Sequence, residues 1–134
     1  MAEQKKKGGL FSKKSDKSSE RQQRLKQSQE AILNRKTPFV VQEAYRTART
    51  NIMFSLAGSG DKCKKLCVTS ANAGEGKTTS TLNLAITFAQ TGSKVLLIDC
   101  DLRKPRIHQY LGVVKTDGLT TNLSKQKRYE DVVY

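Results

Sequence analysis

The stretch at residues 70–79 constrains the fold of this chain more than any other feature of its sequence. It reads SANAGEGKTT, with two glycines one residue apart followed by a lysine and two threonines. Glycines at this spacing let successive backbone N–H groups point toward one place, and a helix that starts there adds the positive end of its dipole. An anion is the natural ligand of such a turn, so these residues are predicted to form a phosphate-binding loop.

The side chains of this loop predict which anion it binds. Lys77 is placed to reach terminal phosphates, and the Thr78 hydroxyl is placed to bind the accompanying magnesium, so the predicted ligand is Mg-ATP or Mg-GTP. The strict pattern GxxxxGKS/T lacks its first glycine, because Ala71 stands there. A turn without a ligand is therefore the alternative. The predicted nucleotide-binding residues are Ala73, Gly74, Glu75, Gly76, Lys77, Thr78 and Thr79.

The segments around the loop predict a strand–helix–strand unit. Residues 65–69 form a short apolar run, residues 78–90 carry apolar side chains at helical spacing, and residues 94–99 contain a second, continuous apolar run. Such a run suits a parallel sheet buried on both faces, and a right-handed crossover would bring its end beside the loop. The predicted fold class is α/β, a parallel sheet with flanking helices.

Two carboxylates follow the second predicted strand. Asp99 and Asp101 would lie at the sheet edge where α/β proteins bind ligands. One can hold the metal or its waters, and the other can accept a proton from an attacking hydroxyl. The alternative for two aspartates at this spacing is a helix cap or a turn.

The positive charge of the chain is concentrated at its N-terminus. Residues 1–36 contain 11 of the 25 Lys and Arg residues but 4 of the 12 Asp and Glu residues. They are predicted to form a disordered basic arm and linker, and residues 37–134 to form the domain portion. Anionic lipid is the favoured partner of the arm over nucleic acid, with a solvated tail as the alternative. No apolar run is long enough to cross a bilayer, which predicts a cytoplasmic location.

A charged stripe is predicted on the helix that precedes the loop. Apolar residues recur at three- and four-residue steps over residues 41–56, which indicates an amphipathic helix. Glu43, Arg46 and Arg49 are spaced by three and lie along one slowly drifting face. The residues alone favour a solvated face with one intrahelical ion pair over a contact with another subunit.

Three local patterns together resemble the bacterial tyrosine kinases of the CpsD/CapB type, which regulate capsule and exopolysaccharide synthesis. Residues 74–78, GEGKT, resemble their Walker A loop, and residues 97–105, LIDCDLRKP, resemble their Walker A′ segment. Residues 43–49 match their oligomerisation motif ExxRxxR. The resemblance spans about residues 38–134 and implies a P-loop NTPase fold of the MinD/ParA type.

The resemblance also implies roles for the residues that match the motifs. It implies an ATP-dependent protein-tyrosine kinase that phosphorylates itself and other proteins. Lys77 would bind phosphate, Thr78 and Asp101 would serve the magnesium, and Asp99 would act toward the attacking tyrosine hydroxyl. These are the predicted catalytic and metal-binding residues.

The partners implied by the resemblance place the chain at a membrane. The family works with a transmembrane modulator whose cytosolic end activates the kinase, at the inner face of the cell membrane. Its ExxRxxR motif, here Glu43, Arg46 and Arg49, implies a homo-oligomer and replaces the solvated-face interpretation.

Two further interpretations compete with the kinase. The MinD/ParA partitioning ATPases share the core but carry a signature lysine where this chain has Asn72. A non-catalytic nucleotide-binding fragment that assembles with a partner is the third hypothesis. The kinase domain of the family continues to a Walker B strand, nucleotide-base contacts and a tyrosine cluster. Because these would follow Tyr134, the domain is expected to be C-terminally incomplete and weakly active or inactive alone.

Overall fold

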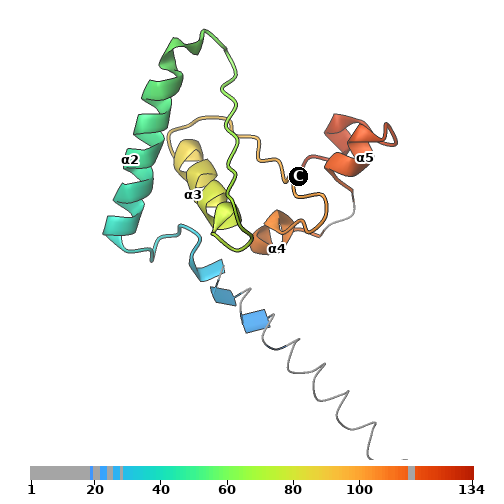
Figure 1. Cartoon of the computed structure of the whole chain (residues 1–134), viewed down its shortest axis with the longest axis horizontal. Coiled ribbons are helices and arrows are strands. Elements are labelled where there is room, and N and C mark those ends of the chain that lie inside the picture. Colours follow the sequence, from blue (N-terminus) through green and yellow to red (C-terminus); the bar gives the residue numbers. More distant parts are fainter. Residues whose placement is uncertain (1–18, 20–21, 24–25, 28, 115–116) are drawn as a thin grey trace, which may run out of the picture.

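The structure of this chain is a computed structural model that describes residues 19, 22–23, 26–27, 29–114 and 117–134. The predicted disordered arm lies largely outside these residues. The described part is helical and is drawn in Figure 1. Its helices are α2 (Phe39–Leu56), α3 (Lys77–Ala89), α4 (Ile107–Leu111) and α5 (Leu119–Leu123), with short 3-10 turns η1 (Ala57–Ser59) and η2 (Tyr129–Asp131).

The long helix α2 begins and ends where the local sequence dictates. Pro38 has an extended backbone and stands before the first turn, where its missing N–H costs no hydrogen bond. At the other end the helix tightens into η1, and Gly60 follows with φ of 66°. A left-handed residue at this place favours glycine because it has no Cβ. The predicted amphipathic helix is therefore confirmed.

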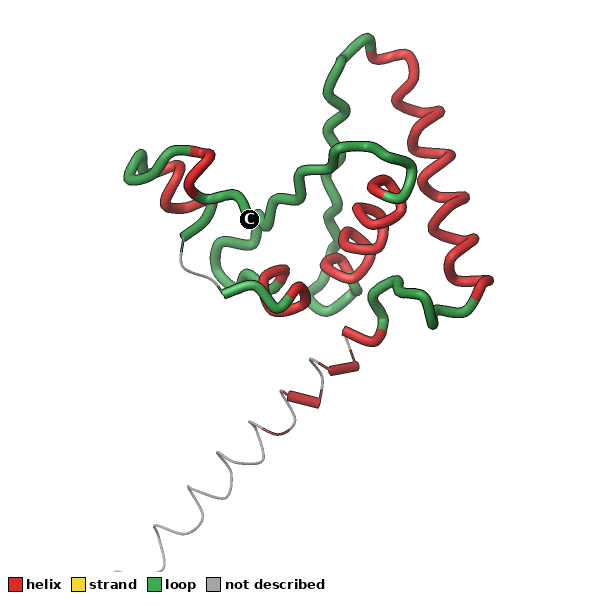
Figure 2. The backbone as a smooth tube through the Cα atoms, turned by 180° about the vertical axis from the view of Figure 1, so that it is seen from behind, coloured by secondary structure: helices red, strands yellow, loops and turns green. Residues whose placement is uncertain are grey.

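A small core lies where α2 packs against α3 (Figure 2). Leu82 and Asn83 of α3 are only 2% and 1% exposed, and Thr87 is equally buried. Leu33, from the segment that precedes α2, is 8% exposed and completes this core. Two of these four side chains are polar, which is tolerated only because their polar atoms are hydrogen-bonded.

The two predicted strands are not present in the part of the chain that the structure describes. Residues 65–69 and 94–99 are not assigned to any strand, and no backbone hydrogen bond joins them to each other. A strand requires a partner for its N–H and C=O groups, and neither run has one here. The apolar side chains predicted to be buried are exposed, as Leu96 at 52% and Ile98 at 49% illustrate. The parallel sheet is thus not confirmed.

The cysteines and short helices complete the described fold. The odd and sparse set of three cysteines predicts reduced and mostly buried thiols; Cys63, Cys67 and Cys100 are free, but all three are exposed, so the predicted burial is wrong. Cys67 lies in the run at residues 65–69 and Cys100 directly follows the run at residues 94–99, and neither run is buried in a sheet among the described residues. The sequence predicts one short helix from Pro105 to Tyr110, stopped by Gly112, and another at residues 118–123, and these correspond to α4 and α5. No helix among the described residues is long and apolar enough to span a bilayer.

Candidate functional site

The backbone of the phosphate loop adopts the conformation that its glycines permit. Gly74 and Gly76 have φ of 87° and 86°, values that side chains with a Cβ rarely adopt. Ala71 has no positive φ, so the missing first glycine of the motif is not required by this backbone. Gly76 is the N-cap of α3 and no side chain caps this helix end. The first-turn N–H groups of α3 therefore point to a place that suits an anion.

Lys77 lies inside the curve of this loop. Its Nζ donates to Ser70 Oγ at 2.8 Å and to the carbonyl oxygen of Asn72 at 3.1 Å. Ser70 Oγ also donates to the same Asn72 carbonyl at 3.0 Å. Both acceptors belong to the loop, so the ammonium group is held against the loop backbone.

Glu75 closes the loop from its outer side. Its carboxylate accepts the Asn72 side-chain amide at 2.8 Å and the Asn72 backbone N–H at 3.2 Å. These hydrogen bonds, the side-chain one first, lower the pKa of Glu75 from its ordinary value. Glu75 therefore shapes the loop through its side chain, and its predicted role in nucleotide binding can involve only its backbone while these bonds persist.

The other predicted loop residues differ in exposure. Ala73 is exposed at the tip, whereas Thr78 and Thr79 are half-buried in the first turn of α3. The Thr78 hydroxyl is an oxygen ligand of the kind magnesium prefers, and it follows directly after the phosphate-binding lysine. The loop, the helix start and the lysine together offer donors that suit the phosphates of a nucleotide.

The two aspartates each cap a local turn. Asp99 Oδ2 accepts the backbone N–H groups of Arg106 and Ile107 at 2.9 and 3.1 Å, and thus caps the start of α4. Its Oδ1 accepts the N–H of Asp101 at 3.1 Å. Asp101 Oδ1 accepts the N–H of Lys104 at 3.0 Å. These contacts are those of a helix cap and a turn, the alternative raised for this pair.

The loop and the aspartates are not directly joined in the described residues. No hydrogen bond or ion pair links residues 70–80 to Asp99 or Asp101. The sheet edge that was expected to bring them together is not formed. The described residues also contain no cluster of three or more potential metal-ligating acidic, histidine or cysteine side chains.

The three charged residues of the predicted stripe on α2 make two different kinds of contact. Arg46 pairs with Glu43 at 2.6 Å, and both side chains are 43% exposed. Arg49 instead donates from Nη1 to the carbonyl oxygen of Thr87 in α3 at 2.9 Å. It therefore joins α2 to α3 within the chain, whereas Glu43 and Arg46 face outward. The oligomerisation role of the stripe stays a prediction.

Comparison with known proteins shows which proteins this chain is similar to. Residues 66–127 match the model of the CobQ/CobB/MinD/ParA nucleotide binding domain. Tyrosine-protein kinase YwqD of Bacillus subtilis (strain 168) is 50% identical over 91 residues, 68% of this chain and 38% of that protein. The resemblance to the bacterial tyrosine kinases is confirmed.

Two further relatives from the kinase family have similar coverage. Tyrosine-protein kinase CpsD of Streptococcus pneumoniae serotype 4 (strain ATCC BAA-334 / TIGR4) is 43% identical over 96 residues, 70% of this chain and 39% of that protein. The putative tyrosine-protein kinase CapB of Staphylococcus aureus is 37% identical over 93 residues, 69% of this chain and 40% of that protein. The chain thus spans about two fifths of each relative's length. No solved structure matches the chain significantly.

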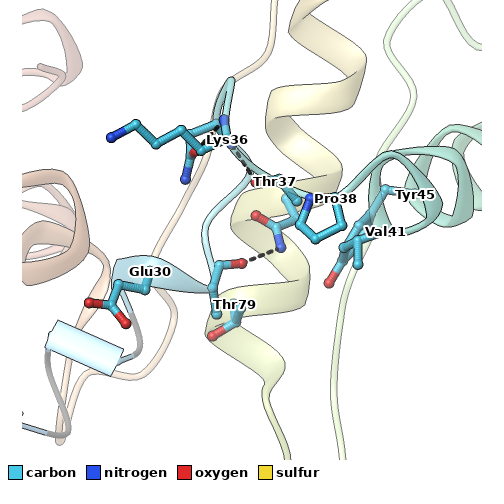
Figure 3. Close-up of a pocket in the computed structure, with 10 residues that line it drawn as sticks. Glu30, Lys36, Thr37, Pro38, Val41, Tyr45 and Thr79 are labelled. Carbon is cyan, nitrogen blue, oxygen red and sulfur yellow. Dashed lines mark hydrogen bonds between the residues drawn. The ribbon is translucent and has the colours of Figure 1, made fainter.

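A hollow of about 590 Å³ lies away from the kinase-type loop, at the start of α2 (Figure 3). Pro38, Val41 and Tyr45 form one side, Glu30 stands opposite, and Thr79 of α3 lies between them. Of the predicted nucleotide-binding residues only Thr79 lines it. This hollow is therefore distinct from the phosphate-binding curve around Lys77.

Sequence reasoning missed two organisers of the loop. Ser70 was read only as its first residue, and Asn72 only as a difference from the partitioning ATPases. In the structure Ser70 Oγ accepts a hydrogen bond from Lys77 and donates one to the Asn72 carbonyl oxygen. The Asn72 side chain donates a hydrogen bond to the Glu75 carboxylate. The available signal was the residue type, since Ser and Asn side chains readily bond nearby backbone groups in turns.

Proposed function

We propose that this chain provides the phosphate-binding part of an ATP-dependent protein-tyrosine kinase that regulates capsule or exopolysaccharide synthesis and phosphorylates itself and other proteins. The placement of Lys77 carries the proposal. Its ammonium group lies inside a loop with two left-handed glycines, at an uncapped helix start. The same stretch belongs to the segment shared with proteins named tyrosine kinases.

The loop binds the phosphates of Mg-ATP. Lys77 exchanges its bonds with Ser70 and Asn72 for bonds to phosphate oxygens, which are stronger because both partners are charged. The first-turn N–H groups of α3 bind the same anion. Thr78 and Asp101 would hold the magnesium through their side-chain oxygens, and Asp101 Oδ1 also accepts the Lys104 N–H.

Phosphoryl transfer then needs a proton acceptor. The tyrosine oxygen bonds to the γ-phosphorus as the bond from phosphorus to the β–γ bridging oxygen breaks and ADP leaves. The hydroxyl proton passes to Asp99. Asp99 Oδ2 accepts two backbone N–H groups and Oδ1 accepts one, so a lone pair of Oδ1 remains to take up this proton while the cap of α4 is kept.

The same proposal includes an assembly at the membrane. Glu43 and Arg46 face outward on α2 and supply charges for a contact between copies of the kinase. A transmembrane modulator of the polysaccharide system activates it at the inner face of the membrane. Lysine-rich residues near the N-terminus favour an anionic lipid surface over nucleic acid.

Replacement of Lys77 by methionine tests the proposal directly. Lys77→Met keeps the length of the side chain but removes the charge, and we expect ATP affinity to fall about 10- to 100-fold. Lys94→Met, at an exposed lysine outside the loop, is the matched control and should bind ATP like the unmodified chain. Affinity is measured by titration with a fluorescent ATP analogue and magnesium.

Kinase activity is measured as the phosphotyrosine that forms when the chain is incubated with Mg-ATP and a modulator peptide. We expect Asp99→Asn to abolish the signal wherever the unmodified chain gives one. ATP hydrolysis stimulated by DNA or lipid vesicles, without labelled tyrosine, would instead identify a partitioning ATPase. Equal ATP affinity of Lys77→Met and Lys94→Met would refute the assignment of the loop.

A further inference from the structure

The segment before α2 is bound by a buried side chain of α3. We call residues 29–34 the strap. The Asn83 side chain accepts the backbone N–H of Leu33 at Oδ1, 2.8 Å away, and donates from Nδ2 to the carbonyl oxygen of Ala31 at 3.0 Å. Asn83 therefore bonds the strap backbone at two points, which fixes its register on the helix.

Because this contact is buried, the loss of its hydrogen bonds would cost free energy. Asn83 is 1% exposed and Leu33 is 8% exposed, so water cannot easily replace either bond. An amide buried without its partners costs far more than a surface one, because it loses its hydration as well. The strap is thus the group that satisfies Asn83, and α3 is the surface on which the strap is ordered.

The strap also touches the helix that Asp99 caps. Gln29 donates from Nε2 to the carbonyl oxygen of Gln109 in α4 at 3.0 Å. Within five residues, the strap therefore contacts α3, which begins at Lys77, and α4, whose start is bound by Asp99. Among the described residues no hydrogen bond joins the loop and the aspartates directly, and the strap bonds to a helix on each side.

The hollow described above is shared by the strap and the first turn of α3. Glu30, Ala31 and Asn34 of the strap line it together with Thr79, two residues after Lys77 (Figure 3). The strap thus lines one hollow with the first turn of α3 and bonds to Asn83 in its second turn. A shift of the strap would therefore change the position of the first turn of α3, which contains Lys77.

We propose that Asn83 is a positioning residue through which the strap sets α3, and with it Lys77, relative to α4 and Asp99. The part that concerns nucleotide affinity rests on the function proposed above. The strap directly follows residues 1–28 in the sequence, so it lies between that lysine-rich stretch and the helices of the chain.

Three variants of the full chain separate positioning from plain stability. Asn83→Leu keeps a similar volume but removes both bonds to the strap, and Leu33→Ala weakens the contact from the strap side. Thr87→Val is the matched control: it removes a buried hydroxyl from the same helix, whose bonds go to Asn83 and Leu84 carbonyls and not to the strap.

The readout is amide hydrogen exchange at Leu33 and at Ser80, whose N–H donates to Gly76 at 2.9 Å. In Asn83→Leu and Leu33→Ala we expect both amides to exchange about fivefold faster than in Thr87→Val, after correction for each variant's melting temperature. Magnesium-dependent binding of the ATP analogue should weaken by about the same factor.

Each outcome decides the proposal. Faster exchange at Leu33 with unchanged exchange at Ser80 would overturn it, as would equal effects of Asn83→Leu and Thr87→Val. If the unmodified chain binds no ATP, the proposed function fails, while exchange at Ser80 still decides whether the strap positions α3. Unchanged ATP affinity in a variant with faster Ser80 exchange would overturn the link to nucleotide binding alone.

Discussion

The phosphate loop and the segment that contains Asp99 and Asp101 are of similar length, but different kinds of contact hold them in place. The loop at residues 70–80 is closed by its own residues, since Lys77 and Glu75 both bond back onto Asn72. The segment at residues 94–106 is held by the bonds of its aspartates and by one backbone bond from Leu102 to Cys100, and Leu96 and Ile98 before them are exposed. A motif that satisfies its polar groups locally forms by itself, whereas a strand needs a partner.

Apolar burial offers the largest test of this contrast. Leu82→Ala removes a side chain that is 2% exposed, and we expect it to lower the free energy of unfolding by about 2–4 kcal/mol. Leu96→Ala, in the exposed run, should change it by less than about 0.5 kcal/mol. Urea unfolding followed by circular dichroism measures both. Similar losses in the two variants would mean that the run at residues 94–98 is packed in solution.

Removal of one cap should produce a smaller, local effect. Asp99→Ala takes away the acceptor of the Arg106 and Ile107 N–H groups, and we expect about 1 kcal/mol of stabilisation to be lost from α4. Hydrogen exchange at Ile107 measures it. Asp101→Ala is the control, because it loses the bond to Lys104 and should leave Ile107 protected. Equal exchange at Ile107 in both variants would contradict the capping role.

The smallest expected effect is a pH dependence of the loop. The pKa of Glu75 is lowered in the folded loop, so its bonds to Asn72 stabilise the loop above the ordinary pKa of a glutamate. They are lost as the pH falls through the lowered value. The side-chain amide resonance of Asn72 should shift over this acidic range. Glu75→Gln should abolish the shift, and a shift that persists in this variant would assign it to another group.

The helices were predictable because their signals are local. Apolar spacing, Pro38, and the glycines at residues 60 and 112 set the bounds of α2 and α4 within a few residues. The phosphate loop was predictable for the same reason, since its glycine spacing describes a backbone conformation. The family resemblance rested on these short motifs and was confirmed by comparison over a longer stretch.

The strands and the inner contacts were not predictable in the same way. A continuous apolar run says that a segment can be buried, but burial depends on groups elsewhere in the chain or beyond it. The sequence also allowed two readings of Asp99 and Asp101, and the structure shows the capping contacts. Asn83 stood unnoticed among apolar neighbours because its two partners belong to a segment fifty residues earlier.

The exposed run at residues 94–98 also has a consequence for how the protein behaves in solution. An extended apolar segment with free backbone groups is a template onto which another extended chain can add. The formal net charge of +13 opposes such association, because like-charged molecules repel one another. Salt screens that repulsion within a Debye length of about 10 Å at 0.1 M. Concentrated, high-salt solutions therefore favour precipitation, and storage at low ionic strength keeps the molecules apart.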